Sequence, residues 1–411
     1  MQRKVRFLIL ILLMSMPISG IISNLIESST ITLWVGRLFR LANIPLFILV
    51  IHNSNIKSIL KQRFSILLVV IIYFSFFYYH TAYNPPLETR GINDIVFNVN
   101  SSTPLFYHLL FGLSLSIYIN KDIAGFDSIL VKFAPYSTIA NAVLMVVMLL
   151  KHGAIFLFVE ALSFNGVTLI IFSYQIVLTL LALIYLWKMK KVNKFSLILF
   201  AIINLALLLS MGKRGPLVSI FVVLLCLWLL RKFSIIKSSV ILIIVISVYN
   251  IIISNIEYVI SLIKIVNNRL GSTLYDLYYY GETSGRDTIH EYAYEQIEQY
   301  PLWGKFPGLI NPSTLDWHFG IHPHNIWLEA IMTMGYIGSI PFFLYILYIL
   351  IFKAMPAFSE KNAYLFFSML FIAEFVHGFM SGSLSYSDIW LSLFVLSLYK
   401  KNDCIKSYGG R

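Results

Sequence analysis

Long apolar stretches recur along almost the whole chain, and they constrain its fold more than any other feature. A helix needs about 17–25 predominantly apolar residues to cross the roughly 30 Å hydrocarbon core of a bilayer. Of the 411 residues, 58% are hydrophobic and only 12% are charged, which lies outside the range of soluble globular domains. The strands of a membrane β-barrel would alternate in polarity, so these unbroken runs predict helices. The chain is therefore expected to be an all-α, polytopic membrane protein.

The apolar runs predict twelve transmembrane helices and one long connection. The predicted helices cover residues 7–27, 31–51, 64–82, 104–120, 128–150, 165–188, 195–211, 215–231, 235–260, 325–352, 361–381 and 384–399. The chain is thus divided into nine helices within 1–260, a large outer loop with short helices at 261–324, three helices within 325–399, and a tail at 400–411. An even number of crossings places both termini on the same side of the membrane.

Lysine and arginine are unevenly distributed between the two sides. Twenty of the 31 fall in segments on the side of the termini, and eight fall in segments on the other side. Because cations resist translocation, this bias places both termini in the cytoplasm and the large loop outside. The net charge of +12 then reflects topology, and no nucleic acid is expected as a partner.

Lys213 and Arg214 disobey this bias, because they lie in the predicted outer turn 211–216. One interpretation is that both side chains extend to lipid phosphates. The other is an anion site, since the flanking glycines let the backbone approach a phosphate and Pro216 starts a helix whose free N–H groups favour negative charge. The planar guanidinium of Arg214 suits a diphosphate, because it binds two oxygens at once.

The large outer loop contains a second candidate cation, Arg286. Residues 283–287 read as a helix start, with Ser284 as the cap, and predict a polar helix that ends at about Gln299. Arg286 would lie in its first turn, where either a bound anion or a salt bridge to a nearby acid would explain it. One face of this helix is predicted to be solvated and carries Glu291, Glu295 and Glu298.

The loop ends with His322, His324 and Asn325 at the start of the tenth predicted helix. The positive end of a helix dipole disfavours imidazolium, so His324 is expected to be neutral near pH 7 and able to act as a general base. A capping or interfacial histidine is the alternative. A zinc site that includes His318 is disfavoured, because no cysteine joins the histidines and their spacing does not match zinc motifs. No metal or other cofactor is expected.

Glu374 and His377 lie three residues apart in the eleventh predicted helix and therefore share a face. Ionisable residues inside a membrane are functional candidates by default. A purely structural pair is the other interpretation, and the sequence does not decide between the two.

Three motifs together resemble the O-antigen ligase/polymerase superfamily, which includes Wzy-type polysaccharide polymerases and WaaL-type ligases. The first two are G-K-R-G-P in a short outer turn and S-G-R in the long outer loop. The third is H-P-H-N-x-x-L-E, followed by Met334-Gly335-Tyr336-Ile337-Gly338. The match covers about residues 211–340, and the N-terminal half agrees with the family only in hydropathy. The family's many transmembrane helices and large periplasmic loop agree with the segments predicted above.

The resemblance implies metal-independent glycosyl transfer from an undecaprenyl-diphosphate-linked glycan at the periplasmic face of the bacterial inner membrane. Matched position by position, Arg214 and Arg286 would hold the donor diphosphate, and His324 would activate the acceptor hydroxyl. A polymerase of O-antigen repeat units, working with a chain-length regulator, is favoured over a ligase of lipopolysaccharide biosynthesis, because no dedicated site for a lipid A-core acceptor is evident. The residues expected to assist substrate binding are Lys213, Arg269, His322 and Asn325.

Two other classes of protein are weighed against this interpretation. A transporter or flippase of lipid-linked oligosaccharides predicts internal repeats and charges along a central cavity, and no repeat is evident. A metal-dependent polytopic glycosyltransferase usually has an acidic motif in its first outer loop. Residues 28–30 read Ser-Ser-Thr there, with Glu27 beside them.

Overall fold

The computed structural model is helical throughout its regular structure, and no strand occurs in the residues that it describes. These are residues 2–26, 29–52, 54, 56–83, 92–152, 169–211, 213–231, 247, 250, 251, 253–266, 268–280, 286–304, 325–380 and 387–400. Five helices within these residues are long and apolar enough to cross a membrane: Trp34–Ile51, Ile123–Lys151, Phe172–Met189, Ile326–Ala357 and Ala363–Met380. The chain is thus a helical membrane protein, and the full set of twelve spans stays a prediction.

The first predicted span is bent. It consists of α1 (Gln2–Leu13) and α2 (Ser15–Leu25), whose axes differ by 59°. Together the two helices pass the same test of length and apolar character and would count as a sixth span. The next predicted span, 31–51, contains α3 (Ser29–Leu41) and α4 (Asn43–Ile51).

Contacts divide the chain into two compact units. Unit 1 comprises Met1–Leu12, Arg37–Ile129 and Arg286–Arg411, and unit 2 comprises Leu13–Gly36 and Leu130–Gly285. Unit 1 therefore joins both ends of the chain, which the linear order of predicted segments does not indicate.

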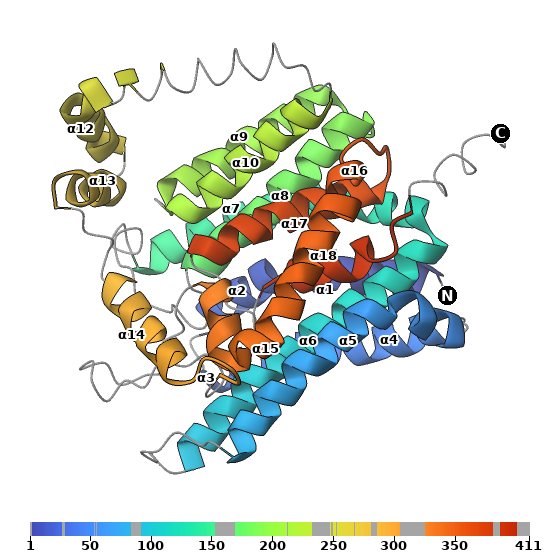
Figure 1. Cartoon of the computed structure of the whole chain (residues 1–411). Helices are drawn as coiled ribbons and strands as arrows, with labels where there is room; N and C mark the ends of the chain where they lie inside the picture. Colours follow the sequence, from blue (N-terminus) through green and yellow to red (C-terminus); the bar gives the residue numbers. More distant parts are fainter. Residues whose placement is uncertain are drawn as a thin grey trace. The chain divides into compact units, whose positions relative to one another are not determined.

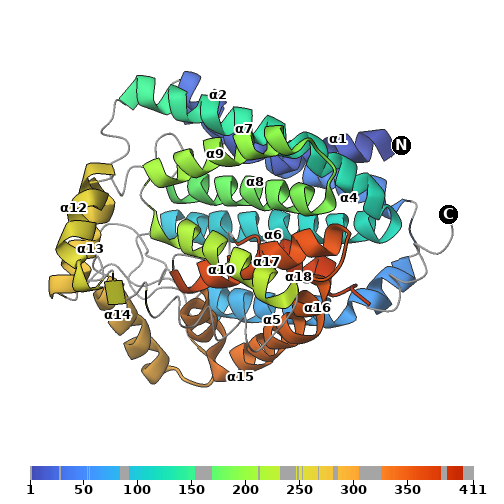
Figure 2. The same cartoon turned by 90° about the horizontal axis from the view of Figure 1, so that it is seen from above.

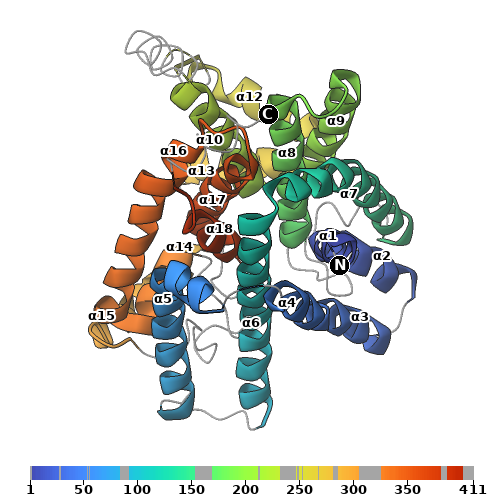
Figure 3. The same cartoon turned by 90° about the vertical axis from the view of Figure 1, so that its right-hand side faces the viewer.

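In unit 1, α6 (Ile92–Lys121) packs against α4 and α18 (Ile389–Leu396), and α5 (Ile56–Tyr83) packs against α15 (Ile326–Ile349). Figure 3 shows α5 beside α15 and α4 beside α6. The fully buried Trp390 joins three of these helices, because its ring lies 6.0 Å from the ring of Tyr73 and 5.9 Å from that of Phe342. The π-helix η3 (Leu350–Ala354) and α16 (Met355–Ala357) extend α15 and lead to α17 (Ala363–Met380).

Helix α18 is shorter than the span predicted at 384–399. Its eight residues, Ile389–Leu396, cover about 12 Å, whereas a crossing helix needs about 20 residues. All eight residues are buried, and the helix packs against α6 and α17. The apolar composition of α18 matches burial inside protein, and the span predicted at 384–399, part of which lies outside the described residues, stays a prediction.

In unit 2, α8 (Leu169–Met189) packs against α2, α9 (Lys194–Ser210) and α10 (Arg214–Arg231). Figure 2 shows α8, α9 and α10 side by side. Helix α7 (Ile123–His152) begins in unit 1 and continues in unit 2. Most of the predicted span 235–260 lies outside the described residues, and its last residues belong to α12 (Ile256–Val266).

Helix α9 illustrates why this unit suits a bilayer. Phe195, Ile198 and Ile202 lie on one face and are 74%, 57% and 58% exposed, whereas Asn204 is fully buried. A water-soluble helix would bury the apolar residues and expose the polar one. The reversed pattern is stable only where hydrocarbon contacts the outer face.

Hydrogen bonds of buried side chains hold the interior of unit 2 together. Asn204 donates from Nδ2 to Thr138 Oγ1 (2.8 Å), and Asn141 donates from Nδ2 to Thr179 Oγ1 (3.2 Å). Gln175 donates from Nε2 to the carbonyl oxygen of Leu13 (3.2 Å), where the chain bends between α1 and α2. Buried polar groups need such partners, and in a membrane they join helices that apolar contacts alone would hold weakly.

Candidate functional site

The seven residues predicted for the site are distributed over both units. Lys213, Arg214 and Arg269 belong to unit 2, and Arg286 and Asn325 belong to unit 1. The structure describes Lys213 and Asn325 fully and the backbone of the three arginines. The two predicted histidines, His322 and His324, lie outside the described residues.

All three predicted arginines begin a helix. Arg214 is the first residue of α10, Arg286 is the first residue of α14 (Arg286–Gln299), and Arg269 is the second residue of α13 (Asn268–Tyr280). The free N–H groups of a first helical turn disfavour a cation and attract an anion. Lys194 also begins a helix, but on the predicted inner side, where the positive-inside rule accounts for it. On the predicted outer side, neither rule favours the three arginines.

Lys213 immediately precedes α10 and is only 9% exposed. A lysine that extended to lipid phosphates would leave its side chain largely outside the protein surface. The observed burial therefore argues against that interpretation for Lys213, and it places a cation beside the first turn of α10.

Arg269 lies in a tight hairpin of α12 and α13. Gly271 allows the two helices to approach, because a Cβ atom there would lie 2.8 Å from the backbone nitrogen of Lys264. The Lys264 ammonium lies 4.7 Å from the centre of the Tyr275 ring. The hydroxyl of Tyr279 donates to Glu257 (2.7 Å), and this bond to a carboxylate raises the pKa of Tyr279 to about 12. The hairpin thus fixes the backbone position of Arg269.

Helix α14 confirms the polar helix predicted to end at Gln299, and all three glutamates on its predicted solvated face are exposed. Its other face packs against α15, as Figure 1 shows, in a cluster of Ile289, Ala293, Ile297, Leu328 and Met332.

Helices α14 and the first part of α15 run in the same direction. Just after α14, the carbonyl oxygen of Pro301 accepts a hydrogen bond from Tyr336 N (2.8 Å), and that of Leu302 accepts one from Ile337 N (3.2 Å). These bonds fix the end of α14 beside residue 336, and the shared cluster fixes its body beside residues 328–332. Both helices therefore begin at the same end of the pair, α14 at Arg286 and α15 at Ile326.

This packing explains Gly335, the first of the two glycines in the Met334–Gly338 segment. Gly335 interrupts α15 with φ 57° and ψ −171°, a conformation that only glycine adopts readily. A Cβ atom at Gly335 would lie 2.2 Å from the carbonyl oxygen of Leu302, and one at Gly338 would lie 2.7 Å from Met334 Cβ. Gly335 therefore allows the contact between the α14 end and α15, and Gly338 allows α15 to approach α5, where a Cβ atom would lie 3.0 Å from Phe76.

Asn325 is the N-cap of α15. Its Oδ1 accepts hydrogen bonds from the backbone N–H groups of Trp327 (2.9 Å) and Leu328 (3.2 Å). Glu329 is buried in the first turn, where a carboxylate interacts favourably with the helix dipole. Capping explains the Asn and the dipole explains the Glu of the third motif, so both support the helix that follows His324.

Comparisons with protein-family models, with curated proteins and with solved structures found no match to this chain. The O-antigen family resemblance therefore rests on the three motifs.

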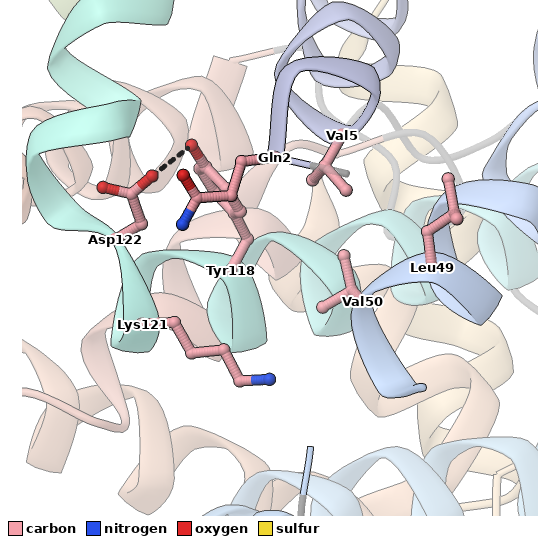
Figure 4. Close-up of a pocket in the computed structure, with 7 residues that line it drawn as sticks. All are labelled: Gln2, Val5, Leu49, Val50, Tyr118, Lys121 and Asp122. Atoms are coloured by element: carbon pink, nitrogen blue, oxygen red, sulfur yellow. Dashed lines mark hydrogen bonds between the residues drawn. The ribbon is translucent and has the colours of Figure 1, made fainter. Parts of the chain in front are cut away.

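A cavity of about 150 Å³ lies elsewhere in unit 1, and none of the predicted site residues lines it. Figure 4 shows its lining: Gln2, Val5, Leu49, Val50, Tyr118, Lys121 and Asp122. Asp122 accepts hydrogen bonds from Arg6 Nη2 (2.8 Å) and the Tyr118 hydroxyl (3.1 Å). Partial burial acts to raise the pKa of Asp122, but these bonds and one from Gly125 N–H outweigh it and lower the pKa. No sequence pattern predicts this network, because Arg6 and Asp122 lie 116 positions apart.

Proposed function

We propose that this protein polymerises undecaprenyl-diphosphate-linked oligosaccharide repeat units into a surface polysaccharide such as O-antigen. The reaction is a metal-independent glycosyl transfer at the periplasmic face of the bacterial inner membrane, with both termini of the chain in the cytoplasm. The three sequence motifs support the family, and the apolar helices support the membrane setting.

The observation that carries the proposal is the position of the arginines. Arg214, Arg269 and Arg286 begin helices on the predicted outer side, where both the helix dipole and the positive-inside rule disfavour them. A bound diphosphate removes both penalties, because it interacts favourably with each guanidinium and with the free N–H groups of the first turns.

The chemistry follows from these roles. His324 accepts the proton of the acceptor hydroxyl, whose oxygen then bonds to the anomeric carbon of the donor sugar. The bond between that carbon and the diphosphate oxygen breaks, and Arg214 and Arg286 stabilise the negative charge that develops on the leaving group. Lys213, Arg269, His322 and Asn325 assist in binding the substrate. The product diphosphate remains attached to its lipid, so a site at the membrane boundary suits the reaction.

The parallel packing of α14 and α15 supports a common site for Arg286 and His324. Both helices begin at the same end of the pair, so the backbone of Arg286 and the start of the helix that follows His324 share one end of unit 1. A surface salt bridge of Arg286 would not require this arrangement.

Purified protein supplied with lipid-linked repeat units tests the proposal. A ladder of lengthening polymer is expected, unchanged by a chelator, and Arg214→Ala, Arg286→Ala or His324→Ala should abolish it while the protein still inserts. Glu298→Gln, at an exposed position of α14, is the matched control and should leave the ladder intact. A reaction that occurs only after lipid A-core is added would identify a ligase, and transport without transfer would identify a flippase. Full-length polymer from all three variants would refute the assigned residues.

A further inference from the structure

A buried carboxylate–histidine pair lies near the end of α17 in unit 1. Glu374 is 4% exposed, and its Oε2 accepts a hydrogen bond from the Ser387 hydroxyl (2.9 Å) and lies 3.3 Å from Nδ1 of His377. The side chain of His377 is 12% exposed. Burying an ionisable carboxylate inside an apolar membrane helix costs free energy, so its presence requires an explanation.

A second carboxylate–histidine pair is formed by Asp388 and His108. Asp388 follows Ser387 directly, and its Oδ1 lies 3.5 Å from Nδ1 of His108 on α6. The Ser387 hydroxyl also accepts a hydrogen bond from the N–H of Ile389, the first residue of α18. Two carboxylates and two imidazoles from α6, α17 and the start of α18 are thus gathered around residues 387 and 388.

The Glu374–His377 pair lies inside the helix bundle, away from the end of α17. Glu374 is six residues before the last residue of α17, which is about 9 Å along the helix axis. Because Ser387 bonds to Glu374, the start of α18 lies at the same depth. Non-helical backbone is tolerated at membrane depth only where protein covers it or water reaches it. The partly exposed side chains of His108 (31%) and Asp388 (32%) indicate that this group extends from the buried pair towards the surface of the unit.

The buried pair also adjoins the start of α15. Gly378, which follows His377, packs so closely on Ile326 that a Cβ atom would lie 2.4 Å from its Cδ1. The ring of Trp327 lies 5.0 Å from that of Phe375 and 5.1 Å from that of Phe379. The turn of α17 that carries Glu374 and His377 therefore supports the first turn of α15, two residues after the proposed base His324.

We propose that Glu374 and His377 exchange a proton with the base of the transfer site and restore it between turnovers. This inference rests on the proposed function. The acceptor hydroxyl loses its proton to His324, the imidazolium formed passes it to the pair, and the pair releases it to solvent. A carboxylate beside a neutral imidazole carries one negative charge, and one added proton makes the pair neutral.

Other titratable groups face this part of the bundle. Helix α15 contributes Glu329 in its buried first turn, α6 contributes His108, and Asp388 precedes α18. Because Glu374 and His377 act through the base and do not touch the substrate, they are positioning residues, and the pH dependence of the rate distinguishes them from purely structural ones.

The test compares Glu374→Gln with wild type in the purified polymerisation assay, over a range of pH. Glutamine keeps the acceptor oxygen for Ser387 and His377 but cannot take up a proton. The rate should fall by about 10²-fold, within the contribution of a positioned proton acceptor, with a displaced pH profile and an unchanged melting temperature. His377→Gln should give the same result, and Glu374→Asp should restore part of the rate.

Two controls separate the outcomes. Glu360→Gln makes the same chemical change at a carboxylate that accepts a hydrogen bond from Tyr399 (2.8 Å) and should keep the wild-type pH profile. Ser387→Ala removes a hydrogen bond to the carboxylate of Glu374 and should displace the profile without abolishing the rate. The inference would be overturned if Glu374→Gln kept the wild-type pH profile. It would also be overturned if this variant lost its rate only because its melting temperature fell, with no displacement of the profile. Wild-type protein that makes no polymer would instead refute the proposed function, and the inference would fall with it.

Discussion

Replacing Gly335 by alanine tests how the third motif builds unit 1. The residue has φ 57° and ψ −171°, and a Cβ atom would lie 2.2 Å from the carbonyl oxygen of Leu302. Forcing alanine into this conformation costs about 1–3 kcal/mol. Moving the chain aside instead breaks the hydrogen bonds from Tyr336 N and Ile337 N, each worth about 0.5–1.5 kcal/mol. Either response costs about the same, so Gly335→Ala should destabilise the protein by about 1–3 kcal/mol.

The assay is the unfolding of purified protein in detergent, followed by tryptophan fluorescence. Trp303 reports locally, because its ring stacks on Phe76 at 6.0 Å beside the Gly335 contact. Gly36→Ala is the matched control, since a Cβ atom there has no neighbour within 4 Å and alanine favours the helix. Equal stability of the two variants would refute the reasoning.

Three further predictions concern single contacts. Because folding lowers the pKa of Asp122, its carboxylate stabilises the folded state above the ordinary value of 3.8, and this stabilisation is lost as pH falls through the lower folded pKa. Asp122→Asn should therefore remove part of the fall in melting temperature at acid pH, and Arg6→Ala should reduce that fall. Gln175→Leu removes the bond to the Leu13 carbonyl and should lower the unfolding free energy by about 0.6–1.7 kcal/mol in a denaturant titration. Asn325→Ala should cost about 1 kcal/mol, and Asn325→Asp should restore it, because either side chain caps a helix.

The sequence predicts local features of this protein well. Capping residues located the polar helix that ends at Gln299, and the predicted turn at 211–216 leads into a helix, which starts at Arg214. Such features depend on neighbours within one or two turns, which the sequence shows directly.

Contacts between distant segments could not be predicted in the same way. Arg6 and Asp122, or Gln175 and Leu13, carry no mutual signal in a single sequence, and the pairing of Glu374 with Ser387 depends on where α18 begins. The apolar residues of α18 predicted a membrane span, because burial in protein and burial in lipid select the same side chains. The twelve-helix topology stays a prediction for the same reason.

The side of the membrane on which the candidate residues lie tests the central claim most directly. In a background with Cys226→Ala and Cys404→Ala, Glu298→Cys reports on α14 and Lys190→Cys reports on the turn between α8 and α9, and both positions are exposed. An impermeant maleimide added to intact spheroplasts should label Glu298→Cys at once and Lys190→Cys only after permeabilisation. Labelling of Lys190→Cys alone in intact spheroplasts would place Arg286 and its helix in the cytoplasm and contradict a periplasmic transfer site.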